Sequence, residues 1–126
     1  MNKKLTVLAV DDDMINLKLI KTILKNNSNI SEVIEAKDGL EALNILKVMD
    51  KINLILLDIK MPIMNGIEFM ENISSIPTKK NIPIIILTTD ESMKHESFDH
   101  GAFDFLVKPI RKDDLYEKIA RVNALI

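Results

Sequence analysis

The chain has 126 residues, 47% hydrophobic and 29% charged, so it is long enough for one domain with an ordinary apolar core and is not disordered. Its 17 basic and 19 acidic residues give a formal net charge of −2, which argues against nucleic-acid binding and a polybasic membrane contact. The lack of cysteine excludes disulfides, thiolate metal sites and a cysteine nucleophile.

The amino terminus begins like a signal peptide, because Lys3 and Lys4 precede the apolar run Leu5–Val10. That run is short, and it continues into Asp11–Asp13 instead of a small-residue cleavage site. No segment of the sequence approaches the roughly 20 apolar residues of a membrane helix. We therefore expect a soluble, cytoplasmic domain.

Short aliphatic runs alternate with amphipathic stretches along the whole chain. Three runs are almost continuously apolar, which is typical of strands covered on both faces in a parallel sheet. Two others carry charges, which edge strands tolerate better than central strands do. The central-strand candidates are Leu5–Val10, Asn53–Asp58 and Ile82–Thr88, and the edge-strand candidates are Ser31–Ala36 and Phe103–Val107.

Helical patterns lie between these runs. Ile15, Leu19 and Ile23 recur at every fourth position, and a fifth helix is expected over Leu115–Ile126. A strand followed by a helix, five times over, predicts an α/β fold with right-handed crossovers. We expect a flavodoxin-like, doubly wound parallel sheet of five strands in the order 2-1-3-4-5, with five helices on both faces.

Three polar residues are predicted to cap helices. Asp13 precedes the first helical pattern and offers a side-chain acceptor to its free amides. Asp38 and Asn65 each stand three residues before a glutamate, Glu41 and Glu68. This spacing predicts a capping box at the start of the second and third helices.

Charged and hydroxyl side chains follow the strands at the end where open parallel sheets bind ligands. Asp11 and Asp12 follow the first strand, Asp58 ends the third, Thr88 ends the fourth and Lys108 follows the fifth. Each has an ordinary structural explanation when taken singly. Bringing the aspartates together costs free energy, because two carboxylates about 4 Å apart repel by roughly 4 kcal/mol at an effective dielectric near 20. A cation offsets this repulsion, and oxygen ligands alone favour Mg²⁺ over zinc or copper.

Four segments resemble the receiver domain of bacterial two-component response regulators, as in the single-domain chemotaxis regulators. They are Val7–Asp12, Leu56–Gly66, Ile86–Thr88 and Gly101–Pro109. Each is weak alone, but all four in this order are specific. The resemblance implies that residues 1–126 form one receiver domain, a phosphoacceptor in a His-to-Asp phosphorelay. It also implies that the chain is not an enzyme beyond self-phosphorylation from small donors and slow self-dephosphorylation.

The resemblance assigns roles to the residues at the strand ends. Asp58 is expected to accept the phosphoryl group, and Lys108 to bind a phosphoryl oxygen as a point charge. Asp11, Asp12, Asp58 and the backbone carbonyl of Lys60 are expected to hold Mg²⁺. The charge neutralisation that phosphoryl transfer needs would come from the metal and the lysine.

The resemblance also implies a conformational switch and partners. Thr88 is expected to hydrogen-bond the phosphoryl group, and Phe105 to rotate into the space that Thr88 vacates. This changes the surface of the fourth helix, fifth strand and fifth helix, which an unknown downstream target reads. The phosphoryl donor is expected to be a sensor histidine kinase or a phosphotransfer protein. The bond from Lys108 to Pro109 is expected to be cis.

Some positions depart from the family pattern. The interval from Thr88 to Gly101 is about two residues shorter than is usual, and residues 90–100 are unusually polar, so the fourth helix is expected to be short or shifted. Thr89 replaces a smaller residue beside the site. Together with the charge of Lys60, its bulk predicts slow hydrolysis of the phosphoaspartate. His95 and His100 are expected to be exposed helix residues.

Two other functions stay open at this stage. One is a Mg²⁺-dependent phosphohydrolase of the haloacid-dehalogenase type, which Asp11 and Asp13 superficially suit. Against it, Ile15 replaces a threonine or valine, Asp58 precedes Thr88 in the wrong order, and the chain is too short for a cap domain. The other is a receiver-like interaction module that works without phosphate. The sequence stops just after the fifth helix, so the chain is expected to be either a stand-alone regulator or part of a longer regulator or hybrid kinase.

Overall fold

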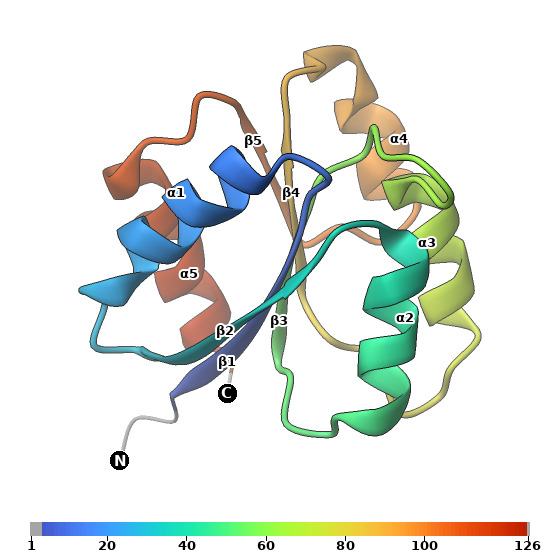
Figure 1. The fold of residues 1–126 in the computed structure, drawn as a ribbon, viewed down its shortest axis with the longest axis horizontal. Helices are drawn as coiled ribbons and strands as arrows, with labels where there is room; N and C mark the ends of the chain where they lie inside the picture. The colour runs from blue at the N-terminus through green and yellow to red at the C-terminus, as the bar shows by residue number, and fades with distance from the viewer. Residues whose placement is uncertain (1–3, 126) are drawn as a thin grey trace.

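The computed structural model describes residues 4–125, and strands and helices alternate in the predicted order (Figure 1). The strands are β1 (Leu5–Val10), β2 (Ile30–Ala36), β3 (Leu54–Leu57), β4 (Ile84–Thr88) and β5 (Asp104–Val107). The helices are α1 (Met14–Lys25), α2 (Gly39–Val48), α3 (Gly66–Ser74), α4 (Lys94–Asp99) and α5 (Lys112–Asn123), and the 3₁₀ turn η1 (Glu91–Met93) precedes α4. Among these described helices, none combines the length and apolar character that crossing a membrane requires.

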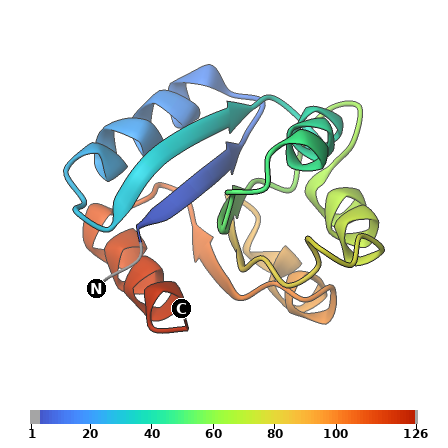
Figure 2. The ribbon, with the colours of Figure 1, turned by 90° about the horizontal axis from the view of Figure 1, so that it is seen from below.

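The five strands form one parallel sheet in the order β2-β1-β3-β4-β5, which confirms the predicted topology. Helices α1 and α5 cover one face, and α2, α3 and α4 lie on the other side (Figure 2). The three apolar runs are the buried central strands, while the charged runs lie at the two edges. Each face therefore has its own hydrophobic cluster against the sheet.

Helix α1 turns a different face to the sheet from the one its most regular spacing indicates. Leu17, Ile20 and Leu24 are buried, whereas Ile15 is 78% exposed and Leu19 is 43% exposed. Residues exactly four apart drift around a helix of 3.6 residues per turn, while a 3-and-4 spacing stays on one side. The four-residue repeat that begins at Ile15 therefore predicted the helix correctly, but the residues that the helix buries are Leu17, Ile20 and Leu24.

The predicted helix caps form at two of three positions in full. The Asp13 carboxylate caps α1, and Asn65 exchanges hydrogen bonds with Glu68 in a complete capping box at α3. At α2 the Asp38 carboxylate accepts from the amide of Glu41 at 2.8 Å. The Glu41 carboxylate, however, accepts from the amide of the residue before Asp38, at 3.2 Å. The capping box predicted there is therefore only half formed.

The last two helices differ from expectation in extent. Helix α5 begins at Lys112 instead of Leu115 and ends at Asn123, and Ile126 lies outside the described residues. Helix α4 is short, as predicted. Its buried residue is Ser97, whose hydroxyl donates to the Met93 carbonyl at 2.7 Å, while its other residues are exposed.

Candidate functional site

The carboxyl ends of β1, β3 and β5 bring Asp11, Asp58 and Lys108 together. Val10 pairs with Leu57 in the sheet, so the aspartates that follow these two residues lie side by side. The ammonium of Lys108 lies 2.7 Å from Asp11 Oδ2 and 3.2 Å from Asp58 Oδ2. One buried cation therefore contacts both carboxylates, as the convergence of strand ends predicts.

The backbone holds the second oxygen of each of these carboxylates. Asp11 Oδ1 accepts from the amide of Asp13 at 2.9 Å, and Asp58 Oδ1 accepts from the amide of Ile59 at 2.7 Å. Charge-assisted bonds of this kind fix side-chain orientation strongly. Both carboxylates are thus oriented before any ligand arrives.

Burial and charge shift the proton affinities at this site in the metal-free protein. Burial raises the pKa of Asp58 and the charge of Asp11 raises it further, while Lys108 opposes both effects. Burial alone would lower the pKa of Lys108, but its hydrogen bond to Asp11 and the charge of Asp58 outweigh this, and the net pKa is raised. Lys108 is therefore a firmly protonated cation at neutral pH.

Three carboxylates are positioned to share one metal ion. Oxygens of Asp11, Asp12 and Asp58 all lie within 4.8 Å of one another, with Asp11 and Asp58 buried and Asp12 exposed. Hard oxygen donors in this number suit Mg²⁺, which also keeps several waters and therefore needs an open side. The donor set and its exposed side fit the predicted ion.

Thr88 ends β4 and its carbonyl accepts from the amide of Lys108, while Phe105 lies on β5. Thr88 is 1% exposed, and its hydroxyl oxygen accepts from the amide of Asp90 at 3.3 Å. Phe105 is 7% exposed, pairs with Ile86 across the two strands, and belongs to the cluster under α2 and α3. Both predicted switch residues are therefore inside the protein, with the aromatic ring packed in the core.

An ion pair between Lys60 and Asp90 connects the loop after β3 to the loop after β4. Their side chains form an ion pair of 3.3 Å, in which the Lys60 side chain is 70% exposed. A hydrogen bond from the Ser92 hydroxyl, helped by Lys60, lowers the pKa of Asp90. Thr89, which precedes Asp90 in the loop after β4, is exposed.

The β3–α3 loop depends on one glycine. A Cβ atom on Gly66 would collide with the carbonyl oxygen of Asp58 and would lie 2.9 Å from the Ile59 Cα. The Gly66 amide donates to the Ile59 carbonyl at 2.8 Å. The start of α3 is therefore packed directly on the backbone that carries Asp58. The peptide bond from Lys108 to Pro109, after β5, is cis, as the resemblance implies.

The two histidines lie away from this site. The His95 side chain is 91% exposed and forms an ion pair of 3.3 Å with Asp99. His100 is half-buried at the end of α4, and its ring nitrogen Nδ1 lies 2.9 Å from the Glu96 carbonyl oxygen. The expectation of exposed helix residues is therefore correct for His95. It is wrong for His100, because that ring folds back onto the last turn of the helix.

The sequence pattern did not single out a buried ion-pair cluster on the α5 side of β5. Asp104 is 8% exposed, and its Oδ2 lies 2.9 Å from Arg121 and 3.3 Å from Lys118. Burying an edge-strand carboxylate requires such partners. The three-residue spacing of the two cations on α5 was the available signal, but it also fits an ordinary solvated face.

The comparisons with known proteins agree with this geometry. The sequence matches the family described as "Response regulator receiver domain" over residues 7–120. A protein-glutamate methylesterase/protein-glutamine glutaminase of Clostridium acetobutylicum is 41% identical over 93% of the chain, which covers 36% of that protein. The chain spans about a third of the length of the first such relatives.

Solved structures share the whole fold. Chemotaxis response regulator CheY4 of Vibrio cholerae is 34% identical, with a TM-score of 0.85 over 95% of this chain and 99% of that one. The receiver domain of sensor histidine kinase PA1611 from Pseudomonas aeruginosa, solved with a magnesium ion coordinated in its active-site cleft, has a TM-score of 0.85 at 22% identity. The match covers 96% of this chain and 98% of the PA1611 receiver domain. At this identity the likeness shows a shared fold.

The chain belongs to the response regulator receiver domain family. Receiver domains are signalling domains of two-component phosphorelays, typically phosphorylated on an aspartate. A haloacid-dehalogenase-type phosphohydrolase is therefore not favoured, and neither is a module that works without phosphate. The enzymatic names among the relatives belong to proteins whose catalytic parts are in other domains.

Proposed function

We propose that Asp58 is the phosphoacceptor of this domain. The observation that carries the proposal is the contact of Lys108 with Asp58 Oδ2 at 3.2 Å, beside the cluster of three carboxylates. A buried carboxylate is a weak nucleophile, but phosphoryl transfer depends mainly on positioning and on neutralising charge. Lys108 supplies a fixed positive charge for the incoming phosphoryl oxygens.

In the proposed transfer, an Asp58 oxygen forms a bond to phosphorus while the bond from phosphorus to the donor nitrogen breaks. The donor histidine takes up a proton from the solvent and leaves as a neutral imidazole. Lys108 keeps its own proton throughout, because its pKa is raised. The Thr88 hydroxyl, which uses its oxygen to accept from Asp90, keeps its hydrogen available for a phosphoryl oxygen.

The proposal includes a magnesium site made of Asp11, Asp12, Asp58 and the backbone carbonyl of Lys60. The three side-chain donors support it through their mutual distances. When bound, the ion neutralises charge that develops on the phosphoryl oxygens. Asp12 is the exposed member of the set, so its substitution tests the metal site with the least disturbance of the core.

The proposed donor is a sensor histidine kinase or a phosphotransfer protein. An exposed apolar stripe on α1, formed by Met14, Ile15 and Leu19, lies at the start of the helix that follows Asp11–Asp13 and supports docking of such a protein next to the site. The output is proposed to pass through Thr88 and Phe105 to the surface of α4, β5 and α5. The same proposal holds that residues 1–126 form one domain. This domain has no enzymatic activity of its own beyond phosphoryl turnover, and it is cytoplasmic.

Labelling with a small phosphodonor tests this function. The purified chain is incubated with acetyl phosphate and MgCl₂, and its intact mass and phosphopeptide map are recorded. We expect one phosphoryl group on Asp58, lost in Asp58→Asn and upon chelation of the metal. Asp114→Asn, an exposed change of the same type on α5, is the matched control and should label normally. Label on Asp11, or label that persists in Asp58→Asn, would contradict the proposal.

A further inference from the structure

We propose that the groove between α1 and the free edge of β2 binds an extended acidic segment of a partner protein, which adds to the sheet as a strand. This surface is separate from the proposed phosphorylation site. Residues 30–33 of β2 border the groove and pair with the start of β1. Asp11 follows the opposite end of β1. The inference therefore does not rest on phosphorylation.

The edge of the sheet is open at β2. This strand pairs with β1 on one side, and no strand of residues 4–125 pairs with it on the other. An edge strand presents unpaired amides and carbonyls, which can form the backbone hydrogen bonds of an added strand. Backbone pairing supplies affinity in this mode, and neighbouring pockets for alternate side chains supply specificity.

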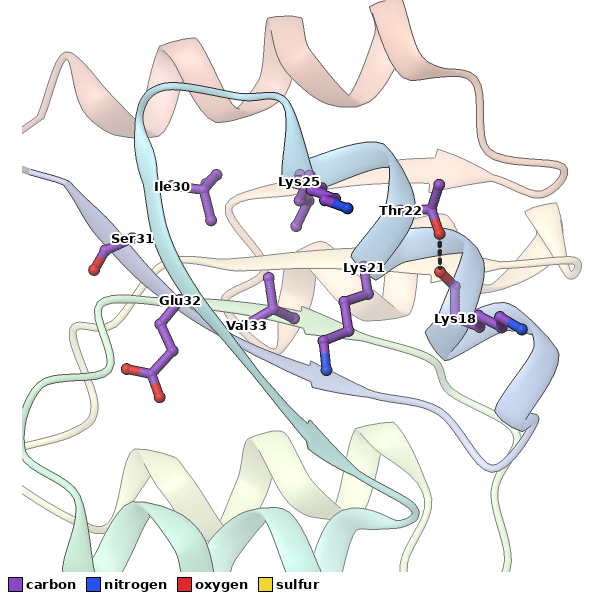
Figure 3. Close-up of a pocket in the computed structure, with 9 residues that line it drawn as sticks. Lys18, Lys21, Thr22, Lys25, Ile30, Ser31, Glu32 and Val33 are labelled. Carbon is purple, nitrogen blue, oxygen red and sulfur yellow. Dashed lines mark hydrogen bonds between the residues drawn. The ribbon is translucent and has the colours of Figure 1, made fainter.

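A cavity of about 570 Å³ lies directly beside this edge. Its apolar lining comes from Leu24 of α1 and from Ile30 and Val33 of β2. Figure 3 shows that polar and charged side chains also project around it from α1 and β2. The volume lies in the range of small ligand sites, so it can accept side chains of a strand paired with β2.

The charges around the groove select an acidic occupant. Lys18, Lys21 and Lys25 line it from α1. Among the described residues, Lys18 and Lys25 have no ion-pair partner, and Lys21 has only a 3.4 Å contact with Glu35.

The acidic residues on β2 do not cancel this positive charge. Glu32, which also lines the groove, is paired with Lys51 at 2.7 Å. The groove and the ion pairs at its border contain four lysines and two glutamates, which leave a local charge of +2 in a chain whose net charge is −2. They are Lys18, Lys21, Lys25, Lys51, Glu32 and Glu35. Complementary charge directs the choice and orientation of a partner more than it adds affinity.

The test uses a dye-labelled heptapeptide of alternating glutamate and valine, titrated against the full chain in fluorescence anisotropy. Two further peptides separate the causes of binding. One has lysine in place of glutamate, and one carries N-methyl groups on every backbone amide, which removes the donors of both strand edges. The protein variants are Lys18→Glu/Lys25→Glu and, as a charge-matched control on exposed positions elsewhere, Lys47→Glu/Lys80→Glu.

We expect the acidic peptide to bind, and to shift the amide resonances of β2 residues. The double change at Lys18 and Lys25 should weaken binding about tenfold, as should N-methylation, while the control pair changes it little. The lysine peptide should not bind.

Three results would overturn the proposal. The first is no binding of the acidic peptide, or equal loss in both protein variants. The second is affinity that N-methylation leaves unchanged, which would indicate an anion site without strand pairing, and competition by inorganic phosphate would identify it. The third is self-association of the unmodified chain in sedimentation that Lys18→Glu/Lys25→Glu abolishes, which would make a second copy of this chain the occupant.

Discussion

Lys108 and Asp11 form the tighter of two buried ion pairs at the strand ends, with 2.7 Å between Nζ and Oδ2. The lysine side chain is 10% exposed and that of Asp11 is 2% exposed. In the metal-free protein this single ammonium compensates both Asp11 and Asp58. Lys108 is therefore a structural cation before it meets any phosphoryl group.

Replacement of Lys108 by methionine is expected to destabilise the metal-free protein. It leaves two buried carboxylates without a counter-charge, which costs on the order of 3 kcal/mol in the free energy of unfolding. Urea denaturation in EDTA measures this loss. MgCl₂ should restore part of it, because a bound cation replaces the missing charge. The exposed Lys47→Met serves as control, and equal stability of Lys108→Met and the parent in EDTA would refute the expectation.

Alanine at Gly66 is expected to impair both stability and phosphorylation. Its methyl group would push the start of α3 away from the backbone of Asp58, at a cost of about 1–3 kcal/mol. Gly101→Ala is the matched control, because Gly101 has φ of +95° but open space around its Cβ position. The control should lose about 1 kcal/mol and label normally with acetyl phosphate. Equal labelling rates in Gly66→Ala and Gly101→Ala would count against a role for Gly66 in positioning the site.

Thr88→Ala is expected to separate phosphorylation from its readout. Asp58 and Lys108 stay in place, so labelling should persist, but the hydroxyl donor next to the phosphoryl group is lost. With beryllofluoride and MgCl₂ as a phosphoryl mimic, the changes in amide chemical shift over α4 and β5 should shrink strongly. Thr88→Ser keeps the hydroxyl and should retain most of them. Full shifts in the alanine variant would remove Thr88 from the switch.

Hydrolysis of the phosphoaspartate is expected to be slow because of Thr89 and Lys60. Thr89 is exposed beside the Lys60–Asp90 ion pair, where attacking water would pass. Thr89→Ala should therefore lose its label several-fold faster than the parent, as measured by the decay of intact-mass signal after the donor is removed. Thr78→Ala, another exposed threonine in a loop, is the control. An unchanged decay in Thr89→Ala would show that bulk at this position does not protect the phosphoryl group.

The fold and the placement of the acids could be predicted because both depend on features that sequence records directly. Continuous apolar runs locate the central strands, and parallel pairing then brings Asp11, Asp58 and Lys108 to one end of the sheet. Capping at Asn65 also follows from local spacing. These features need no knowledge of packing distances.

Features that depend on packing were not predictable in the same way. The buried side of α1 is set by how the helix rests on the sheet, so Leu17 is buried while Ile15 is exposed. Asp104 is buried on an edge strand because Arg121 reaches it from α5, a contact between residues 17 apart in sequence. Glu41 bonds one residue earlier than a capping box requires. Each outcome follows from geometry between elements.

Helix α4 rests on the sheet side through the hydroxymethyl group of Ser97, where the other helices use leucine, isoleucine or phenylalanine. Apart from Phe98, which is 40% exposed, this helix covers little hydrocarbon, and hydrocarbon burial is the main resistance to sliding or unwinding a helix. A single hydrogen bond, worth about 1 kcal/mol, is then a larger share of the cost of moving α4 than it is for the other helices. Helix α4 begins a few residues after Thr88. A small change in the position of Thr88 at the end of β4 can therefore displace this helix.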